Sequence, residues 1–141
     1  MTTQEYLGQI SRLNRVINNK LKELSQLKEL SISISAIKNS ERVQTTPNFD
    51  KIGSAYCKIE ELEEKIDKLV DEYIQKREKT IEQIESLENE TEYQILFSKY
   101  ITGDTLEKIS KDMNYVYRNI TRLHGKALKS FEKKYGNQYL S

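Results

Sequence analysis

The sequence predicts an all-α protein, in which a long antiparallel helical hairpin of the coiled-coil kind precedes a group of shorter helices. The 141 residues contain one proline and five glycines, so few positions force a helix to break. Apolar residues recur every three or four positions along most of the chain, which is the period of an amphipathic helix. Hydrophobic residues make up 36% of the chain, enough for one modest core.

The first predicted element is an amphipathic helix over residues 6–30. Polar residues separate its apolar side chains, which recur at helical spacing. They are Leu7, Ile10, Leu13, Ile17, Leu21, Leu24, Leu27 and Leu30. Residues 31–35 alternate serine and isoleucine as a strand would, but this stretch is short and isolated. We therefore expect the helix to continue and to end near Ile37.

The clearest loop in the sequence covers residues 39–49, which are polar and include the only proline, Pro47. Thr46 followed by Pro47 is a suitable start for a second helix, because proline at the first helical position loses no hydrogen bond. Because of Gly53, this helix can also begin several residues later.

The second helix is predicted from about Lys51 to Leu87, a rod of roughly 55 Å at 1.5 Å per residue. Its apolar residues are spaced 3-4-3-4, as in a coiled coil. They are Ile59, Leu62, Ile66, Leu69 and Tyr73. The next two positions are the polar Lys76 and Thr80, and the apolar pattern then resumes one residue over. It continues at Ile81, Ile84 and Leu87.

Two long helices joined by a loop predict an antiparallel hairpin, here as a first domain of residues 1–90. Within it, residues 50–98 hold 7 basic and 14 acidic side chains. A solvated coiled-coil surface and an acidic docking surface both account for these acids, and no pair of them stands out as catalytic. The main ones are Glu60, Glu61, Glu63, Glu64, Asp67, Asp71 and Glu72.

The second predicted domain covers residues 91–141 and consists of three shorter helical units. Gly103 suits the left-handed turn between the first two, and Asp104 or Thr105 can cap the second. Its apolar residues are Leu106, Ile109 and Met113. A tight connection at Asn114-Tyr115 leads to a last helix from about Val116 to Tyr135.

The last helix has one apolar face and one basic face at about 100° per residue. The apolar residues within roughly 60° of Val116 are Ile120, Leu123, Ala127 and Phe131. The opposite face holds Arg118, Thr121, Arg122, Gly125 and Lys129. Gly125 costs ~1 kcal/mol relative to alanine in a helix interior. It either permits a close approach to a partner, or it is a substitution without function that the helix tolerates (tolerated drift).

This basic part of the chain favours an anionic partner, since residues 99–141 hold 9 basic and 4 acidic side chains although the whole chain is only +1. Two short helices, the second with an apolar back and a basic front, are the components of a DNA-binding helix-turn-helix. A solvated helix on a bundle has the same pattern. On the first hypothesis Tyr117, Arg118, Thr121 and Arg122 face bases. The phosphate-contacting residues are then Lys111, Lys126, Lys129, Lys133 and Lys134.

Other site types find little support in the sequence. No apolar run approaches the roughly 18 residues of a membrane-spanning helix, and Met1–Glu5 lacks the pattern of a secretory signal. Cys57 and His124 are the only residues of their kinds, so we expect no disulfide framework, no zinc site and no cofactor. We expect a cytoplasmic protein that is not an enzyme.

A family resemblance favours the DNA-binding hypothesis. Residues 92–100 (EYQILFSKY) and 105–113 (TLEKISKDM) resemble region 4 of sigma-70-type factors, with Ile109 and Ile120 at core positions. Residues 120–128 (ITRLHGKAL) resemble the closing segment of small phage regulators of the RinA and ArpU type. In these late-gene activators a helical N-terminal half precedes a region-4-like module. The resemblance covers roughly residues 50–135 and extends more loosely to residues 1–45.

The sequence also departs from that family pattern. Asn114 replaces the usual turn glycine, although asparagine tolerates left-handed geometry. Val116 stands where a serine or threonine cap is common, and Tyr93 replaces an arginine. Nothing resembles a sigma region 2, so this protein is expected to recruit or adapt a polymerase and not to melt a promoter alone.

These observations predict a sequence-specific, DNA-binding transcriptional regulator encoded by a phage or prophage. Double-stranded DNA is the expected partner, with host RNA polymerase and a second copy, paired through the hairpin, as further candidates. Two alternatives remain open. One is a DNA-packaging adaptor of the small-terminase kind. The other is a helical protein–protein adaptor that does not bind DNA.

Overall fold

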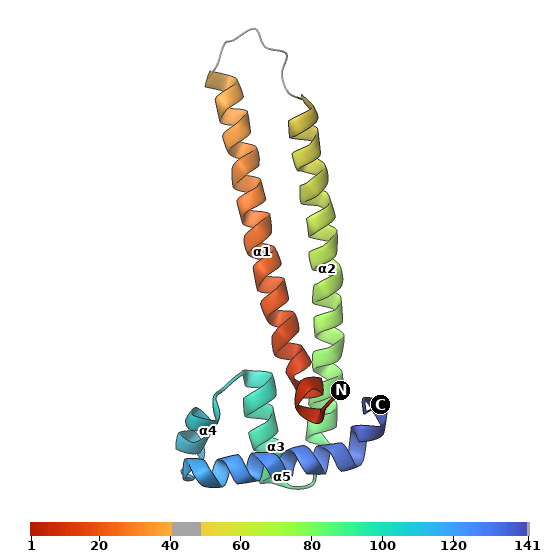
Figure 1. The fold of residues 1–141 in the computed structure, drawn as a ribbon, viewed down its shortest axis with the longest axis vertical. Coiled ribbons are helices and arrows are strands. Elements are labelled where there is room, and N and C mark those ends of the chain that lie inside the picture. The colour runs from red at the N-terminus through yellow and green to blue at the C-terminus, as the bar shows by residue number, and fades with distance from the viewer. Residues whose placement is uncertain (41–48, 141) are drawn as a thin grey trace. The chain divides into compact units, whose positions relative to one another are not determined.

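The computed structural model describes the backbone of residues 1–40 and 49–140 and the side chains of residues 1–33 and 53–140. The regular elements in these residues are all helical (Figure 1), which confirms the predicted all-α class. The long helices are α1 (Thr3–Ser40) and α2 (Phe49–Glu85). The shorter elements are α3 (Glu90–Leu96), the π-helix η1 (Phe97–Thr102), α4 (Leu106–Met113), α5 (Tyr117–Tyr135) and the 3-10 helix η2 (Gly136–Gln138).

The chain forms two compact units. One contains Met1–Asn14 and Tyr73–Ser141, and the other contains Arg15–Glu72. We call them the terminal unit and the hairpin unit. The predicted boundary at residue 90 separates the long helices from the short ones. The division into compact units is different, because the terminal unit includes both the start of α1 and the end of α2. The domain boundary therefore stays a prediction.

In the hairpin unit, α1 and α2 run antiparallel side by side (Figure 1), as two long helices joined by a loop predict. Ile17 of α1 and three α2 residues, Ile59, Leu62 and Ile66, are buried. The serine–isoleucine stretch 31–35 is helical, and α1 continues to Ser40. Of the predicted loop, residues 41–48 lie outside the described residues, and so does the expected Thr46–Pro47 cap.

The hairpin unit leaves part of its predicted apolar stripe uncovered. Leu21 is 46% exposed and Leu30 is 59% exposed, although both belong to the apolar stripe predicted for residues 6–30. Ile32 and Tyr56 are also exposed in this unit.

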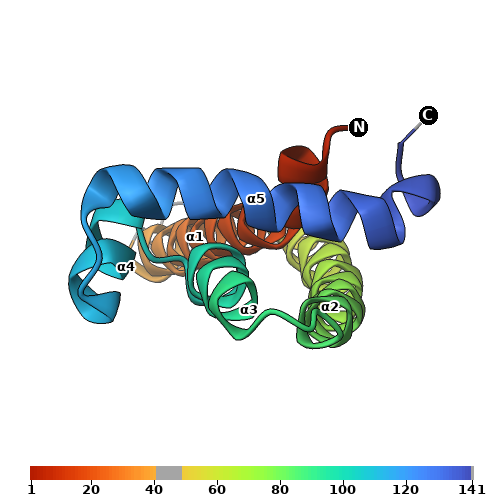
Figure 2. The ribbon, with the colours of Figure 1, turned by 90° about the horizontal axis from the view of Figure 1, so that it is seen from below.

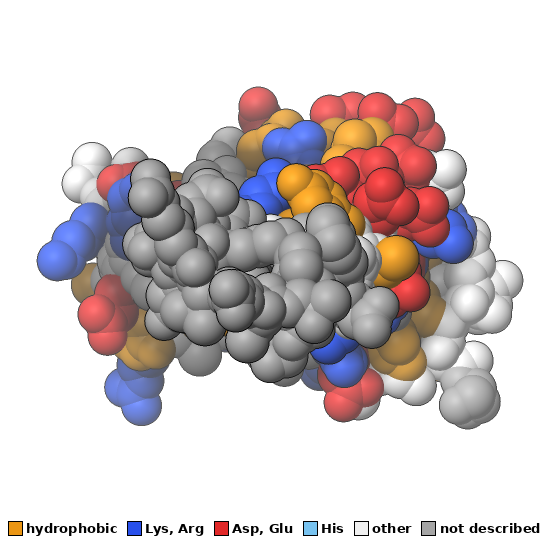
Figure 3. All heavy atoms as spheres, turned by 90° about the horizontal axis from the view of Figure 1, so that it is seen from above, with side chains coloured by type: hydrophobic (Ala, Val, Ile, Leu, Met, Phe, Trp, Pro, Cys, Tyr) orange, Lys and Arg blue, Asp and Glu red, His pale blue; other side chains and the backbone are white. Residues whose placement is uncertain are grey.

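The acidic residues of α2 face solvent. All seven carboxylates predicted to lie on wet faces are exposed, from Glu60 to Glu72. Figure 3 shows acidic side chains, in red, gathered along one side of the surface visible there. Among the seven carboxylates, Glu63 lies with its Oε1 3.4 Å from Lys28 Nζ. Both side chains of this ion pair are exposed, so the pair contributes little stability.

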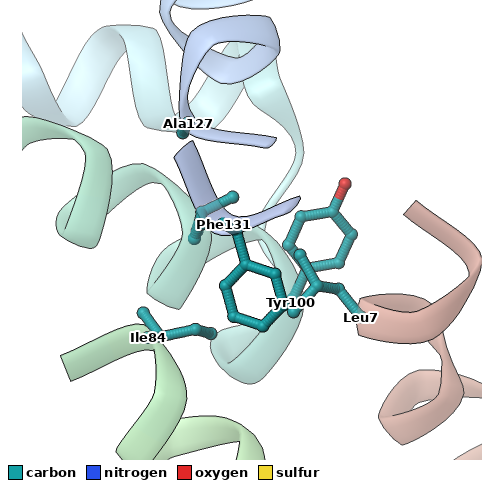
Figure 4. Packing of buried hydrophobic residues seen from close by; sticks show 6 residues of the cluster. Leu7, Ile84, Tyr100, Ala127 and Phe131 are labelled. Carbon is teal, nitrogen blue, oxygen red and sulfur yellow. The ribbon is translucent and has the colours of Figure 1, made fainter. Parts of the chain in front are cut away.

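Phe131 is at the centre of the main core of the terminal unit. Its side chain is fully buried and packs with Leu7 of α1, Ile84 of α2 and Tyr100 of η1 (Figure 4). Ile84, where the apolar pattern of α2 resumes one residue over, is fully buried, but Thr80 and Gln83 on the original register are buried as well. This core joins elements from both ends of the sequence.

Tyrosines at the edge of this core hold the chain ends with their hydroxyl groups. Thr3 Oγ1 and Tyr139 Oη are 2.8 Å apart, and the Tyr6 hydroxyl donates to Gln83 Oε1 at 2.8 Å. The rings of Tyr6 and Tyr139 stack with centroids 4.3 Å apart. Both tyrosines therefore pack half-buried against the core, with their polar tips hydrogen-bonded.

A second, smaller core forms where α3, α4 and α5 meet (Figure 2). It consists of Ile95, Ile109 and Ile120, all buried, with one residue from each helix. Half-buried residues pack around it: Leu106, Met113 and Leu123. The apolar positions predicted for α4 are therefore confirmed, as are Ile120 and Leu123 of α5, and they fix α5 against its two neighbours.

Candidate nucleic-acid interface

The connection between α4 and α5 is a tight turn whose backbone groups are satisfied locally. Thr105, not Asp104, caps the start of α4, since its Oγ1 accepts from Lys108 N at 3.2 Å. At the other end Asn114 adopts φ 58°, the left-handed conformation that its side chain tolerates. The amides of Asn114 and Tyr115 donate to Lys111 O and Ser110 O, the Schellman pattern that ends a helix.

Val116 immediately precedes α5 and is its N-cap residue. Its side chain makes no capping hydrogen bond and is 73% exposed. Helical spacing puts Val116 at the start of the apolar stripe, whereas the family pattern puts it at the cap position, and in the structure it is the cap residue. The stripe begins one turn later at Ile120, because a residue before the first helical turn lies outside the packed face. The predicted start of α5 itself is confirmed to within one residue.

The four predicted base-facing residues lie together on the first two turns of α5. Tyr117, Arg118, Thr121 and Arg122 are all exposed. Thr121 Oγ1 donates to the Tyr117 carbonyl at 3.0 Å. The guanidinium of Arg122 donates to Asn119 Oδ1 at 2.9 Å, which holds one arginine in a defined position. Sequence reasoning did not foresee this role of Asn119.

The five predicted phosphate-contacting lysines are exposed but do not form one group. Lys111 lies in the last turn of α4, whereas Lys126 and Lys129 lie along the middle of α5. Lys134 is 16 residues beyond Arg118, about 24 Å at 1.5 Å per residue. Its Nζ donates to the Ser86 carbonyl at 2.8 Å, so it already holds the end of α2 against α5. Lys133 precedes it in the last turn of the helix.

Gly125 lies on the same face of α5 as Thr121 and Arg122. A Cβ added there would meet no atom within 4 Å. No contact inside the protein therefore requires a glycine at this position, and both explanations given by the sequence, close approach of a partner and tolerated drift, remain open.

His124 and Tyr100 form a buried polar pair behind this face. The Tyr100 hydroxyl lies 2.8 Å from His124 Nε2 and joins η1 to α5. Burial, and then the positive charge of Lys99, lower the pKa of His124. Burial raises the pKa of Tyr100 to about 12, so its hydroxyl stays protonated and can donate to the neutral imidazole. The sequence contains no signal for this pair, because its members are 24 residues apart.

We expect acidification to destabilise the protein partly through His124. Below the unfolded pKa of about 6.5, the unfolded chain binds a proton that the folded imidazole, with its lowered pKa, resists. The free energy of unfolding therefore decreases as the pH falls below the unfolded pKa. Urea unfolding at pH 7.5 and 5.5 should show a larger loss for the wild type than for His124→Gln. Equal losses would exclude this explanation.

Comparisons of the chain with protein-family models, with curated protein sequences and with solved structures find no match. In the described residues, no helix combines the length and apolar character needed to cross a membrane. The same residues contain no group of three or more His, Cys, Asp or Glu side chains placed to hold a metal ion.

Proposed function

We propose that this chain is a sequence-specific DNA-binding transcriptional regulator of phage or prophage origin, with α4 and α5 as a helix-turn-helix and α5 in the major groove. One observation carries the proposal. Tyr117, Arg118, Thr121 and Arg122 are exposed on a helix whose other face is buried against α3 and α4. Side chains of this chemistry bind base edges, and a helix fixed from behind can present them in a constant geometry.

Electrostatics gives a second support. Lys111 and Lys129 flank the base-facing residues and are exposed, so they are available to neutralise phosphates. Lys134 is the weakest of the predicted phosphate contacts, because its ammonium is bonded to the Ser86 carbonyl. We therefore propose that the contact surface is concentrated on the turn and the first half of α5.

The resemblance to region 4 of sigma-70-type factors suggests how such a protein acts. We propose that it acts in the cytoplasm by recruiting or adapting a polymerase. The short connection at Asn114-Tyr115, with its left-handed asparagine, supports the helix-turn-helix assignment despite the missing turn glycine. One departure from the family pattern is also seen in the structure: Val116 makes no side-chain capping bond.

Selection of bound DNA from a random duplex pool, with the full-length protein, tests the proposal. We expect one enriched motif, and fluorescence anisotropy on that motif should give an affinity that falls steeply with salt. Failure to bind any DNA at low salt would contradict the proposal and favour the protein–protein adaptor. Light scattering of the complex adds the copy number: a monomer or dimer agrees with regulation, whereas a ring of many copies favours the packaging adaptor.

A further inference from the structure

Three consecutive aromatic or apolar side chains are exposed at the turn between α4 and α5. Tyr115 is 40% exposed, Val116 is 73% exposed and Tyr117 is 52% exposed. Val116 is the most exposed large apolar residue in the described part of the chain. We call these three exposed neighbours the turn patch.

Neither helix stability nor core packing accounts for valine at this position. Valine is a poor N-cap, because it has no oxygen to accept from the first free amides, and Val116 makes no side-chain capping bond. It also belongs to neither apolar core of the terminal unit. Val116 is therefore available to contact a partner at the start of α5.

The surroundings of the turn patch indicate an anionic partner. Lys111 precedes it by four residues, and Arg118 and Arg122 follow it on α5, all exposed. The patch therefore lies within the surface that the proposed function assigns to DNA. In the major groove, the C5-methyl group of thymine is the one apolar group that base edges present, and side-chain methyl groups contact it.

We propose that Val116 contacts a thymine methyl group in the major groove and so makes this protein select an A·T pair at that position. This inference rests on the proposed DNA-binding function and names one element of the DNA that it recognises. Arg118, Thr121 and Arg122 then bind neighbouring base edges by hydrogen bonds, while Val116 recognises the methyl by burial of apolar surface.

Deoxyuridine provides the direct test, because it differs from thymidine only by the absence of this methyl. The DNA site enriched from the random pool is made once with thymidine and once with deoxyuridine at every such position. We expect the wild-type protein to bind the thymidine duplex about fourfold more tightly for each methyl buried, as ~0.8 kcal/mol per methylene implies.

Val116→Ser isolates the contribution of the side chain. Serine removes both methyl groups and adds a capping oxygen, so the helix should form at least as well. We expect the ratio of thymidine to deoxyuridine affinity to fall toward one in this variant. Ile32→Ser, which removes an exposed apolar side chain from the hairpin unit, should leave the ratio unchanged.

Each alternative outcome is decisive. If the wild type binds the two duplexes equally, or if Val116→Ser retains the full ratio, the methyl contact is excluded while DNA binding stands. A selected site without thymine also excludes it. If no DNA is bound, the proposed function itself fails, and the turn patch is left for a protein partner.

Discussion

Replacing Phe131 by alanine should lower the free energy of unfolding by about 3–5 kcal/mol, the largest stability effect expected of a single substitution in this chain. The ring is fully buried between α1, α2 and η1. It also packs against the rings of Tyr6 and Tyr135, with centroids 6.0 and 5.2 Å away. Alanine would leave a cavity lined by elements from both ends of the sequence.

Urea unfolding followed by circular dichroism measures this effect. Phe131→Leu keeps most of the apolar volume and should cost less than the alanine variant. Tyr56→Ala, which removes an aromatic ring that is 60% exposed in the hairpin unit, should change stability by less than about 0.5 kcal/mol. A loss that small for Phe131→Ala would contradict the assignment of this residue to the core.

The double substitution Arg118→Ala/Arg122→Ala should weaken binding to the selected DNA by about 100-fold or more. A bidentate arginine contact to a base contributes about 1–3 kcal/mol of discrimination, and two such contacts are lost. The preference for the selected site over random DNA should fall as well, because base contacts carry specificity whereas phosphate contacts weaken all sequences alike. Fluorescence anisotropy on both DNAs, over a range of salt concentrations, measures these effects.

Arg12→Ala/Arg15→Ala is the matched control for this experiment. It removes the same two charges from exposed positions of α1, so it corrects for the change in net charge. We expect it to alter affinity by much less than the α5 variant does. Unchanged affinity and an unchanged salt slope in Arg118→Ala/Arg122→Ala would exclude the placement of α5 in the groove.

Much of the secondary structure is predictable from the sequence because its signals are local. The apolar period identifies α1 and α2, and the change of register in α2 is visible as polar Thr80 before apolar Ile84. Gly103 and Asn114 mark two helix ends, and both adopt left-handed conformations. These features depend on residues at most a few positions apart, so a single sequence is enough to locate them.

The candidate interface is predictable in part. The exposure of Arg118 and Arg122 follows from helical spacing, since the opposite positions are apolar. The role of Lys134 does not follow, because its contact with Ser86 joins residues 48 positions apart. The position of Val116 does not follow from helical spacing either, because periodicity cannot tell whether a residue lies in the first turn of a helix or just before it.

By itself, the sequence determined the helices, most of their ends, and which side of α5 is basic. Only the tertiary structure decided that Thr3 and Tyr139 meet, that Phe131 is enclosed by both ends of the chain, and that His124 is buried against Tyr100. The physical reason is the separation along the sequence over which each kind of interaction acts. Helix formation depends on hydrogen bonds and side chains within about one turn, whereas the core depends on shape and burial among segments up to 136 residues apart.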